Sequence, residues 1–253
     1  MLSLLGILIL SFFLGMRHAT DPDHVVAITT IVTRQRGSAK AGLIGILWGL
    51  GHTFTIFLVG TMIILFQVTI PTRVGLSMEL TVAAMLILLG VLNLTGTLRW
   101  LQQNFTPNLG LLAPDTQSSN SAAKSKSTNP KPCLNAMFKG LGLCNILRPL
   151  VIGIVHGLAG SAAVALLVIT TIHNPWWAIA YLLLFGIGTI AGMMLITALL
   201  AMPFAFAVRR FSGFNRGMAI ASGLLSLGFG LFLSYQIAFV DGLFSSHPRW
   251  IPH

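Results

Sequence analysis

The stretch Arg17-His18-Ala19-Thr20-Asp21-Pro22-Asp23-His24 follows the apolar run Leu2–Met16 and combines two histidines with two carboxylates. It holds two of the five acidic residues in a chain of 253 residues. Ionisable groups at membrane depth are costly and mark ion or substrate paths. Imidazole nitrogen together with carboxylate oxygen suits a borderline divalent metal such as Ni²⁺, Co²⁺ or Zn²⁺. The stretch therefore predicts a transition-metal site inside a membrane protein.

The composition indicates the same class. The chain is 55% hydrophobic and 8% charged, with a mean hydropathy of +0.87, whereas soluble domains carry about 25% charged residues. We therefore expect an all-α polytopic membrane protein whose main partner is the lipid bilayer. In such a chain the net charge of +10 reports topology and contact with anionic lipid, and we expect no nucleic-acid partner.

Six apolar segments predict six transmembrane helices. The first runs to Thr33 but is interrupted at Asp21-Pro22, because proline disfavours the helical conformation of the residue before it and starts a new helix well. Asp21 is then a natural N-cap, and we expect the irregular backbone at this break to line a cavity. The other five spans are predicted at Ala41–Phe66, Met78–Leu98 (opening with Glu79), Arg148–Ile172, Trp177–Val208 (ending near Pro203) and Gly217–Val240.

Two inverted three-helix repeats are predicted from a faint internal similarity. His18…Ala27-Ile-Thr-Thr-Ile31 is echoed by His156…Val168-Ile-Thr-Thr-Ile172, and Trp48-Gly-Leu-Gly51 by Phe185-Gly-Ile-Gly188. Because each half has an odd number of spans, the halves run in opposite directions, with the site expected at their interface near the midplane. The predicted organisation is a first repeat with the metal motif (1–98), a polar, disordered linker (99–146), a second repeat (147–240) and a short tail (241–253).

The distribution of lysine and arginine predicts the orientation. One side of the predicted topology carries two or three of them: Arg73, Arg249 and, inside the first span, Arg17. The opposite side carries twelve: Arg34, Arg36, Lys40, Arg99, Lys124, Lys126, Lys131, Lys139, Arg148, Arg209, Arg210 and Arg216. We therefore expect the chain to cross the cytoplasmic membrane with both termini outward and the linker in the cytoplasm.

Metal ligands are predicted first at His18, Asp23 and His24. If a helix begins at Pro22, Asp23 and His24 lie in its first turn and His18 is free to fold back toward them. Three such groups without a ligand would be costly in lipid. Alternatively, the histidines hydrogen-bond locally while Asp21 and Asp23 only cap the helix; for Asp21, capping and metal binding are both open.

Two further histidines are candidates. His52 lies between glycines and hydroxyls, where it acts as a fourth ligand or a relay, or else only packs and bonds to a neighbouring threonine. His156 takes the repeat-equivalent place without carboxylates and is expected as a pathway or outer group. Other residues considered are Glu79 as a solvated interfacial charge, Asn93, Thr95 and Thr189 as path-lining groups, His173, His247 and His253 as surface histidines, and Cys133 and Cys144 as free thiols.

The motif resembles the nickel/cobalt transporter family known as NiCoT. Arg17–His24 matches its signature Arg-His-Ala-x-Asp-Ala-Asp-His except for Pro22, and Gly51-His52-Thr53 matches its second motif. The family's later acidic motif is absent, and His156-Gly-Leu-Ala-Gly-Ser161 stands in its place, which is similar to the shorter UreH-like relatives associated with urease. The resemblance implies metal transport rather than catalysis, with no organic cofactor.

The expected function is import of Ni²⁺, or of Co²⁺, into the cytoplasm by a secondary transporter. No hydrolytic or ATP-binding signature is present. Alternatives are an exporter, a carrier of Zn²⁺, Mn²⁺ or Fe²⁺, and a metal-sensing subunit that docks urease or hydrogenase maturation proteins. A membrane metalloenzyme would need an open coordination position and a base such as Asp21 or Asp23.

Overall fold

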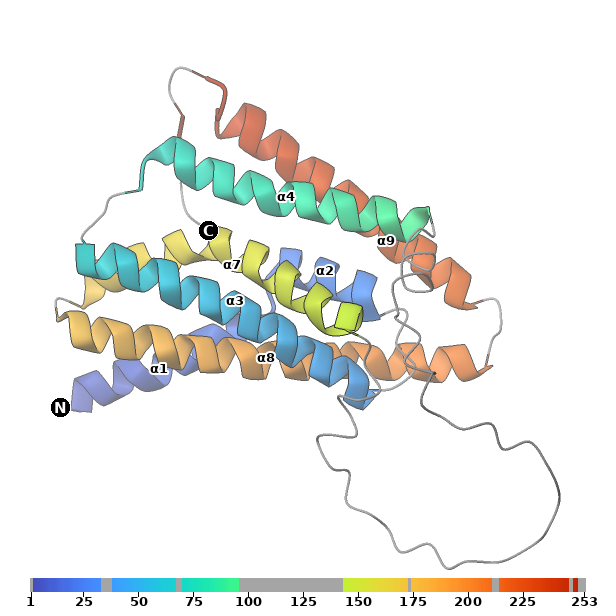
Figure 1. The fold of residues 1–253 in the computed structure, drawn as a ribbon, viewed down its shortest axis with the longest axis horizontal. Coiled ribbons are helices and arrows are strands. Elements are labelled where there is room, and N and C mark those ends of the chain that lie inside the picture. Colours follow the sequence, from blue (N-terminus) through green and yellow to red (C-terminus); the bar gives the residue numbers. More distant parts are fainter. Residues whose placement is uncertain are drawn as a thin grey trace, which may run out of the picture.

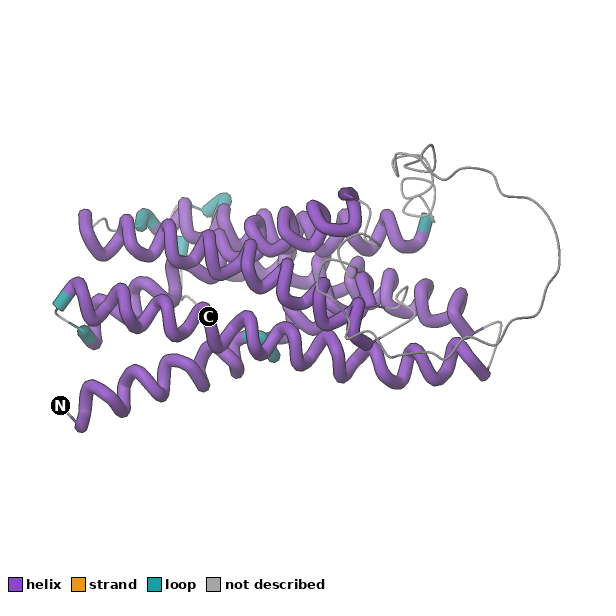
Figure 2. Tube along the Cα trace, turned by 60° about the horizontal axis from the view of Figure 1, so that its bottom comes forward, coloured by secondary structure: helices purple, strands orange, loops and turns teal. Residues whose placement is uncertain are grey.

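A computed structural model describes residues 2–32, 38–66, 70–95, 143–172, 174–210, 214–245 and 248–249. Every regular element within these ranges is a helix, so the all-α class is confirmed (Figure 2). The predicted linker lies mostly outside the described residues. The elements in chain order are α1 (Leu2–His18), α2 (Pro22–Val32), α3 (Ser38–Phe66), α4 (Thr72–Leu94), α7 (Leu143–Thr171), α8 (Pro175–Arg210), α9 (Phe214–Tyr235) and the π-helical turn η2 (Gln236–Val240).

Four helical segments are long and apolar enough to cross a membrane, whose hydrocarbon core takes roughly 20 residues of helix. Shorter apolar helices lie at Leu5–His18, Pro22–Val32 and Leu147–Gly160. The chain is thus a helical membrane protein, while the count of six spans stays a prediction. The four long segments are Ala39–Phe66, Thr72–Leu94, Pro175–Pro203 and Gly217–Val240.

The first predicted span is discontinuous at the motif. α1 ends at His18, and α2 begins at Pro22. Tight turns close the gap, with the Asp21 N–H donating to the His18 carbonyl at 3.1 Å. The Asp21 carbonyl in turn accepts the Val25 N–H at 3.0 Å, which makes Asp21 the backbone N-cap of α2. The break therefore follows the local preference of Pro22, as the sequence indicates.

One predicted helix boundary was wrong. α4 begins at Thr72 rather than Met78, so Glu79 lies inside the helix instead of opening it. The apolar span of α8 ends at Pro203, as predicted, and the helix itself continues to Arg210, because a membrane helix tolerates proline where neighbouring groups satisfy the freed carbonyl.

Close helix contacts at glycines bring the central helices together. A side chain on Gly51 of α3 would collide with the Leu150 backbone of α7, and one on Gly153 of α7 would collide with the Trp48 backbone of α3. Small residues let membrane helices approach this closely and add dispersion contacts. α3 packs extensively against both α7 and α8, and it therefore forms the centre of the bundle.

α4 and α9 form a pair along one side of the bundle (Figure 1). Asn93 of α4 donates hydrogen bonds to the Ala219 carbonyl and to the Ser222 hydroxyl of α9, both at 2.9 Å. Ser226 of α9 donates to the Leu86 carbonyl at 2.8 Å. These buried polar contacts hold the pair in one register.

Candidate metal site

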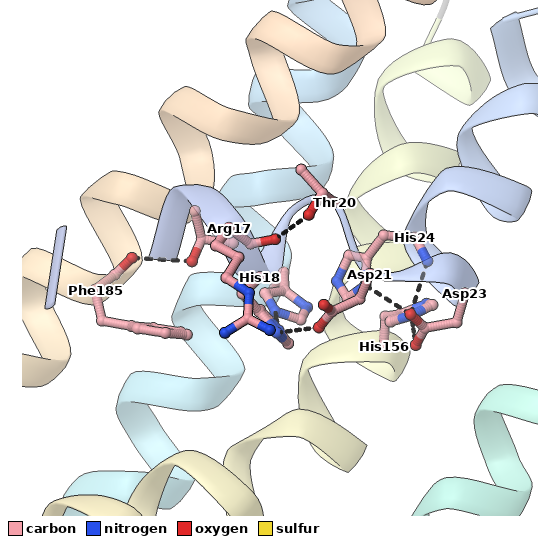
Figure 3. A network of polar contacts seen from close by, with 10 residues as sticks. Arg17, His18, Thr20, Asp21, Asp23, His24, His156 and Phe185 are labelled. Carbon is pink, nitrogen blue, oxygen red and sulfur yellow. Dashed lines mark hydrogen bonds and ion pairs between the residues drawn. The ribbon is translucent and has the colours of Figure 1, made fainter. Parts of the chain in front are cut away.

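The break between α1 and α2 sets the first three site residues. His18 is the last residue of α1, while Asp23 and His24 lie in the first turn of α2. Nδ1 of His18 lies 2.7 Å from Oδ2 of Asp21 (Figure 3). A carboxylate on one ring nitrogen fixes the orientation of an imidazole and leaves its other nitrogen for a ligand. Asp21 thus orients His18 rather than capping α2 with its side chain.

His52 reaches the same place from α3. Its side chain is fully buried, and its Nε2 lies 3.1 Å from Nε2 of His18. The ring of His24 lies 4.8 Å from that of His18 and 5.0 Å from that of His52, measured between ring centroids. The fold therefore brings together three histidines that the sequence separates by up to 34 residues.

His156 of α7 is joined to the site through Asp23. Oδ2 of Asp23 lies 2.8 Å from Nε2 of His156, and Oδ1 of Asp23 lies 3.0 Å from Nδ1 of His24 (Figure 3). Oδ1 also accepts the His24 backbone N–H at 2.9 Å. One carboxylate thus bridges two histidines from helices far apart in the sequence. All four histidines that the structure describes meet here.

Two sets of candidate ligands result. We call His18, His24 and His52 the inner group, and Asp23, His24 and His156 the cavity group. Within each group the possible ligand atoms all lie within 4.8 Å of one another. Metal–nitrogen bonds of about 2.0–2.1 Å in a tetrahedral site put neighbouring ligand atoms roughly 3.4 Å apart, so the widest separation in either group would have to shorten by up to roughly 1.4 Å to close on an ion.

Several ring nitrogens in these groups are buried without a hydrogen-bond partner. They are Nε2 of His24, Nδ1 of His52 and Nδ1 of His156, and the indole Nε1 of Trp48 beside them is in the same state. Buried polar atoms are nearly always paired, and leaving one unpaired costs about 1–3 kcal/mol. Nε2 of His24 is thus free for an ion, whereas His52 and His156 turn their other nitrogen, Nε2, toward His18 and Asp23.

Aromatic side chains form the walls around the histidines. The Trp48 ring stacks on His24 with centroids 5.7 Å apart and planes inclined by 20°. Phe185 of α8 lies 5.5 Å from His18 on another side. These contacts restrict the imidazole rings and lower the local dielectric, which strengthens any interaction with a cation.

A cavity of about 450 Å³ leads to the site between α2, α4, α7 and α9. Four of the five acidic residues of the chain line it: Asp21, Asp23, Glu79 and Asp241; the fifth, Asp115, lies outside the described residues. Acidic groups gathered in one recess raise the local concentration of cations. His18, His24 and His156 also line the cavity. His52, in contrast, lies behind them.

The other predicted path residues take different places. Asn93 bonds to α9, the Thr189 hydroxyl donates to the Phe185 carbonyl, and the exposed Thr95 donates to the Val91 carbonyl. None of the three lines the cavity. Trp48, Gln236 and Asp241 were missed, although Asp241 could have been noticed as one of so few acidic residues. Outside the described residues or side chains lie His173, His247, His253, Cys133 and Cys144.

The fold and the site define a helical membrane protein in which histidines and carboxylates form groups that could hold a metal ion. A profile of the NicO family, described as high-affinity nickel-transport protein, matches residues 4–238. The chain therefore belongs to this family of nickel transporters, and not to a family of enzymes. The predicted resemblance to nickel/cobalt transporters is confirmed.

One relative extends the comparison. The urease accessory protein UreH of Bacillus sp. (strain TB-90) is 33% identical over 241 residues, which cover 95% of this chain and 96% of the relative. This similarity confirms the predicted relation to the shorter UreH-like proteins. No solved structure matches the chain.

Proposed function

We propose that the protein imports Ni²⁺ through the inner group, and that Co²⁺ competes for the same site. The observation that carries the proposal is the convergence of His18, His24 and His52 inside a bundle whose family transports nickel. Neutral imidazoles suit Ni²⁺ and Co²⁺, and they bind them more tightly than Mn²⁺ or Fe²⁺.

The carboxylates supply the charge that the imidazoles lack. Asp21 bonds to His18 and Asp23 bonds to His24, so both hold ligands in place from behind. Two negative charges beside the site also offset the cost of bringing a divalent ion into a poorly solvated interior. We infer that the ion exchanges its water shell for these groups near the bilayer midplane.

We further propose that the two halves are inverted repeats that move against each other. In this arrangement α1 corresponds to α7, α3 to α8 and α4 to α9. The α1–α8 contact then corresponds to the α7–α3 contact, while the α3–α8 and α4–α9 contacts each correspond to themselves. Single contacts follow the same exchange, since Gly15 meets the backbone of Phe185 as Gly153 meets that of Trp48. Repeats of this kind support alternating access about a fixed site.

The proposed direction of transport rests on the membrane potential, and the charge distribution gives only the orientation of the chain. With both termini outward and twelve basic residues on the cytoplasmic side, the protein lies in the cytoplasmic membrane. A divalent cation moving inward gains roughly 4.6 kcal/mol per 100 mV, from about 2.3 kcal/mol per charge. That free energy corresponds to accumulation of roughly a thousandfold without ATP.

A urease maturation pathway is the proposed user of the nickel. The support is the similarity to UreH, a urease accessory protein. Direct docking of a maturation protein would instead use the linker. A carrier that only supplies the ion needs no such contact, so deleting the linker should leave both nickel uptake and urease activation intact, whereas lost activation with intact uptake would indicate docking.

Uptake of ⁶³Ni²⁺ tests the proposal in cells that express the wild type or His18→Ala, His24→Ala and His52→Ala variants. We expect saturable uptake in the wild type, competition by excess Co²⁺ and loss of uptake in all three variants. Thr95→Ala is the control, because Thr95 is exposed and lies away from the cavity. Wild-type cells that accumulate less nickel than empty cells would show export and overturn the proposal.

A further inference from the structure

We infer that the ion has a second binding position, made by the cavity group Asp23, His24 and His156, and that His24 serves both positions in turn. The inference rests on the proposed function and adds to it a step between the cavity and the inner group. It gives the second half of the chain a metal ligand, His156, which comes from α7.

The ligand atoms of the cavity group are already in contact. Asp23 holds His156 at 2.8 Å through one carboxylate oxygen and His24 at 3.0 Å through the other. His24 and His156 are 1% and 2% exposed, and their rings lie 4.3 Å apart between centroids. A carboxylate with two imidazoles is a common ligand set for a divalent transition metal.

His24 faces the two groups with different nitrogens. Its Nδ1 is the atom beside Asp23, so Nε2, which has no hydrogen-bond partner, is left for His18 and His52. A neutral imidazole has one lone pair, because its other nitrogen carries the proton. His24 can therefore coordinate one ion at a time, and the two positions are alternatives for a single ion: as the ion passes from Nδ1 to Nε2, the ring proton passes from Nε2 to Nδ1, whose N–H can then donate to Oδ1 of Asp23.

The cavity sets the order of the two positions. Asp23, His24 and His156 all line it, whereas His52 does not. An ion arriving through the cavity thus meets a carboxylate and two imidazoles before it can reach His52. The negative charge of Asp23 favours the first loss of water ligands, and the three neutral imidazoles of the inner group receive the ion next.

Metal binding to the purified full-length protein in lipid nanodiscs tests the second position. His52→Ala removes only the inner group, and His156→Ala removes only the cavity group. His156→Gln is added because its amide N–H can still donate to Asp23 and preserve the structural contact. Bound Ni²⁺ is counted by equilibrium dialysis, and the ligand set is read from Ni K-edge X-ray absorption and from the visible d–d bands of bound Co²⁺.

We expect one ion per chain in the wild type and in each single variant. The ligand signature should show two imidazoles and a carboxylate in His52→Ala, and three imidazoles in both His156 variants. The double variant His52→Ala/His156→Ala should bind about 10- to 100-fold more weakly than either single variant. Nickel uptake should fall about tenfold or more in His156→Gln as well as in His156→Ala.

Two results would overturn the second position. One is a His52→Ala protein that folds but binds no metal, and the other is wild-type uptake in His156→Gln, which would reduce His156 to a structural partner of Asp23. Failure of the proposed import gives a different pattern, since the wild type would then show no uptake while the ligand signatures with Ni²⁺ and Co²⁺ still report the cavity group.

Discussion

Gly153→Ala should damage nickel transport although no ligand is changed. A Cβ at this position would collide with the Trp48 carbonyl oxygen and would lie 2.7 Å from Cδ1 of Trp48 and 2.9 Å from the backbone nitrogen of His52. Carbon atoms pack best at about 3.5–4.0 Å, so α7 must move from α3 by roughly 1 Å. Overpacking of this kind costs about 1–3 kcal/mol.

The displacement acts directly on the site. α3 carries Trp48 and His52, and α7 carries His156. Separating the two helices by roughly 1 Å misplaces the ligands, and an error of that size can lower a rate about 100-fold. We therefore expect initial ⁶³Ni²⁺ uptake to fall about 10- to 100-fold, with lower thermal stability in detergent.

Gly228→Ala is the matched control. The same substitution is made within a helix, but a Cβ at Gly228 meets nothing within 4 Å. Alanine there should leave uptake unchanged and raise stability slightly, since glycine inside a helix costs about 0.5–1 kcal/mol relative to alanine. Wild-type uptake in Gly153→Ala, or an equal loss in both variants, would refute the link between the α3–α7 contact and the site.

Four further outcomes are expected. Asp21→Asn should weaken Ni²⁺ binding about 10- to 100-fold, because His18 loses the charge that orients its ring; unchanged affinity by equilibrium dialysis would contradict that role. Asn93→Ala should lower the free energy of unfolding by about 1–2 kcal/mol, seen as a lower melting temperature with uptake per folded molecule unchanged; a loss of uptake at equal stability would place Asn93 in the path instead. Ni²⁺ at 100 times its Kd should add about 2.7 kcal/mol of stability to the wild type, and none to His24→Ala. Deleting residues 102–132 should leave uptake intact, and lost uptake would show that transport itself needs the linker.

The sequence predicted the parts of the site that depend on local chemistry. Pro22 disfavours the helical conformation of Asp21 and starts a new helix well, which places His18, Asp23 and His24 at a helix junction. His52 was a candidate because it is a histidine within an apolar helix, preceded by glycines and followed by threonines. Its contact with His18 could not be derived, since it depends on how α3 crosses the break between α1 and α2.

His156 shows where prediction from sequence ends. It was expected as an outer group, because no carboxylate lies near it in the sequence. The fold supplies one from 133 residues away, in Asp23. The cavity is a similar case, since Asp21, Glu79 and Asp241 are brought together only by the packing of α2, α4 and α9. One helix boundary failed, since α4 begins at Thr72, directly after Pro71, and not at Met78.

Nickel flux into sealed vesicles tests the central claim most directly. The purified protein is reconstituted into liposomes, and a potassium gradient with valinomycin sets an interior-negative potential of about 100 mV, worth roughly 4.6 kcal/mol for a divalent ion. The account predicts that ⁶³Ni²⁺ accumulates inside wild-type vesicles, that accumulation follows the potential, and that His24→Ala vesicles match protein-free ones. Wild-type vesicles that gain no nickel under this potential, or His24→Ala vesicles that gain as much as the wild type, would contradict it.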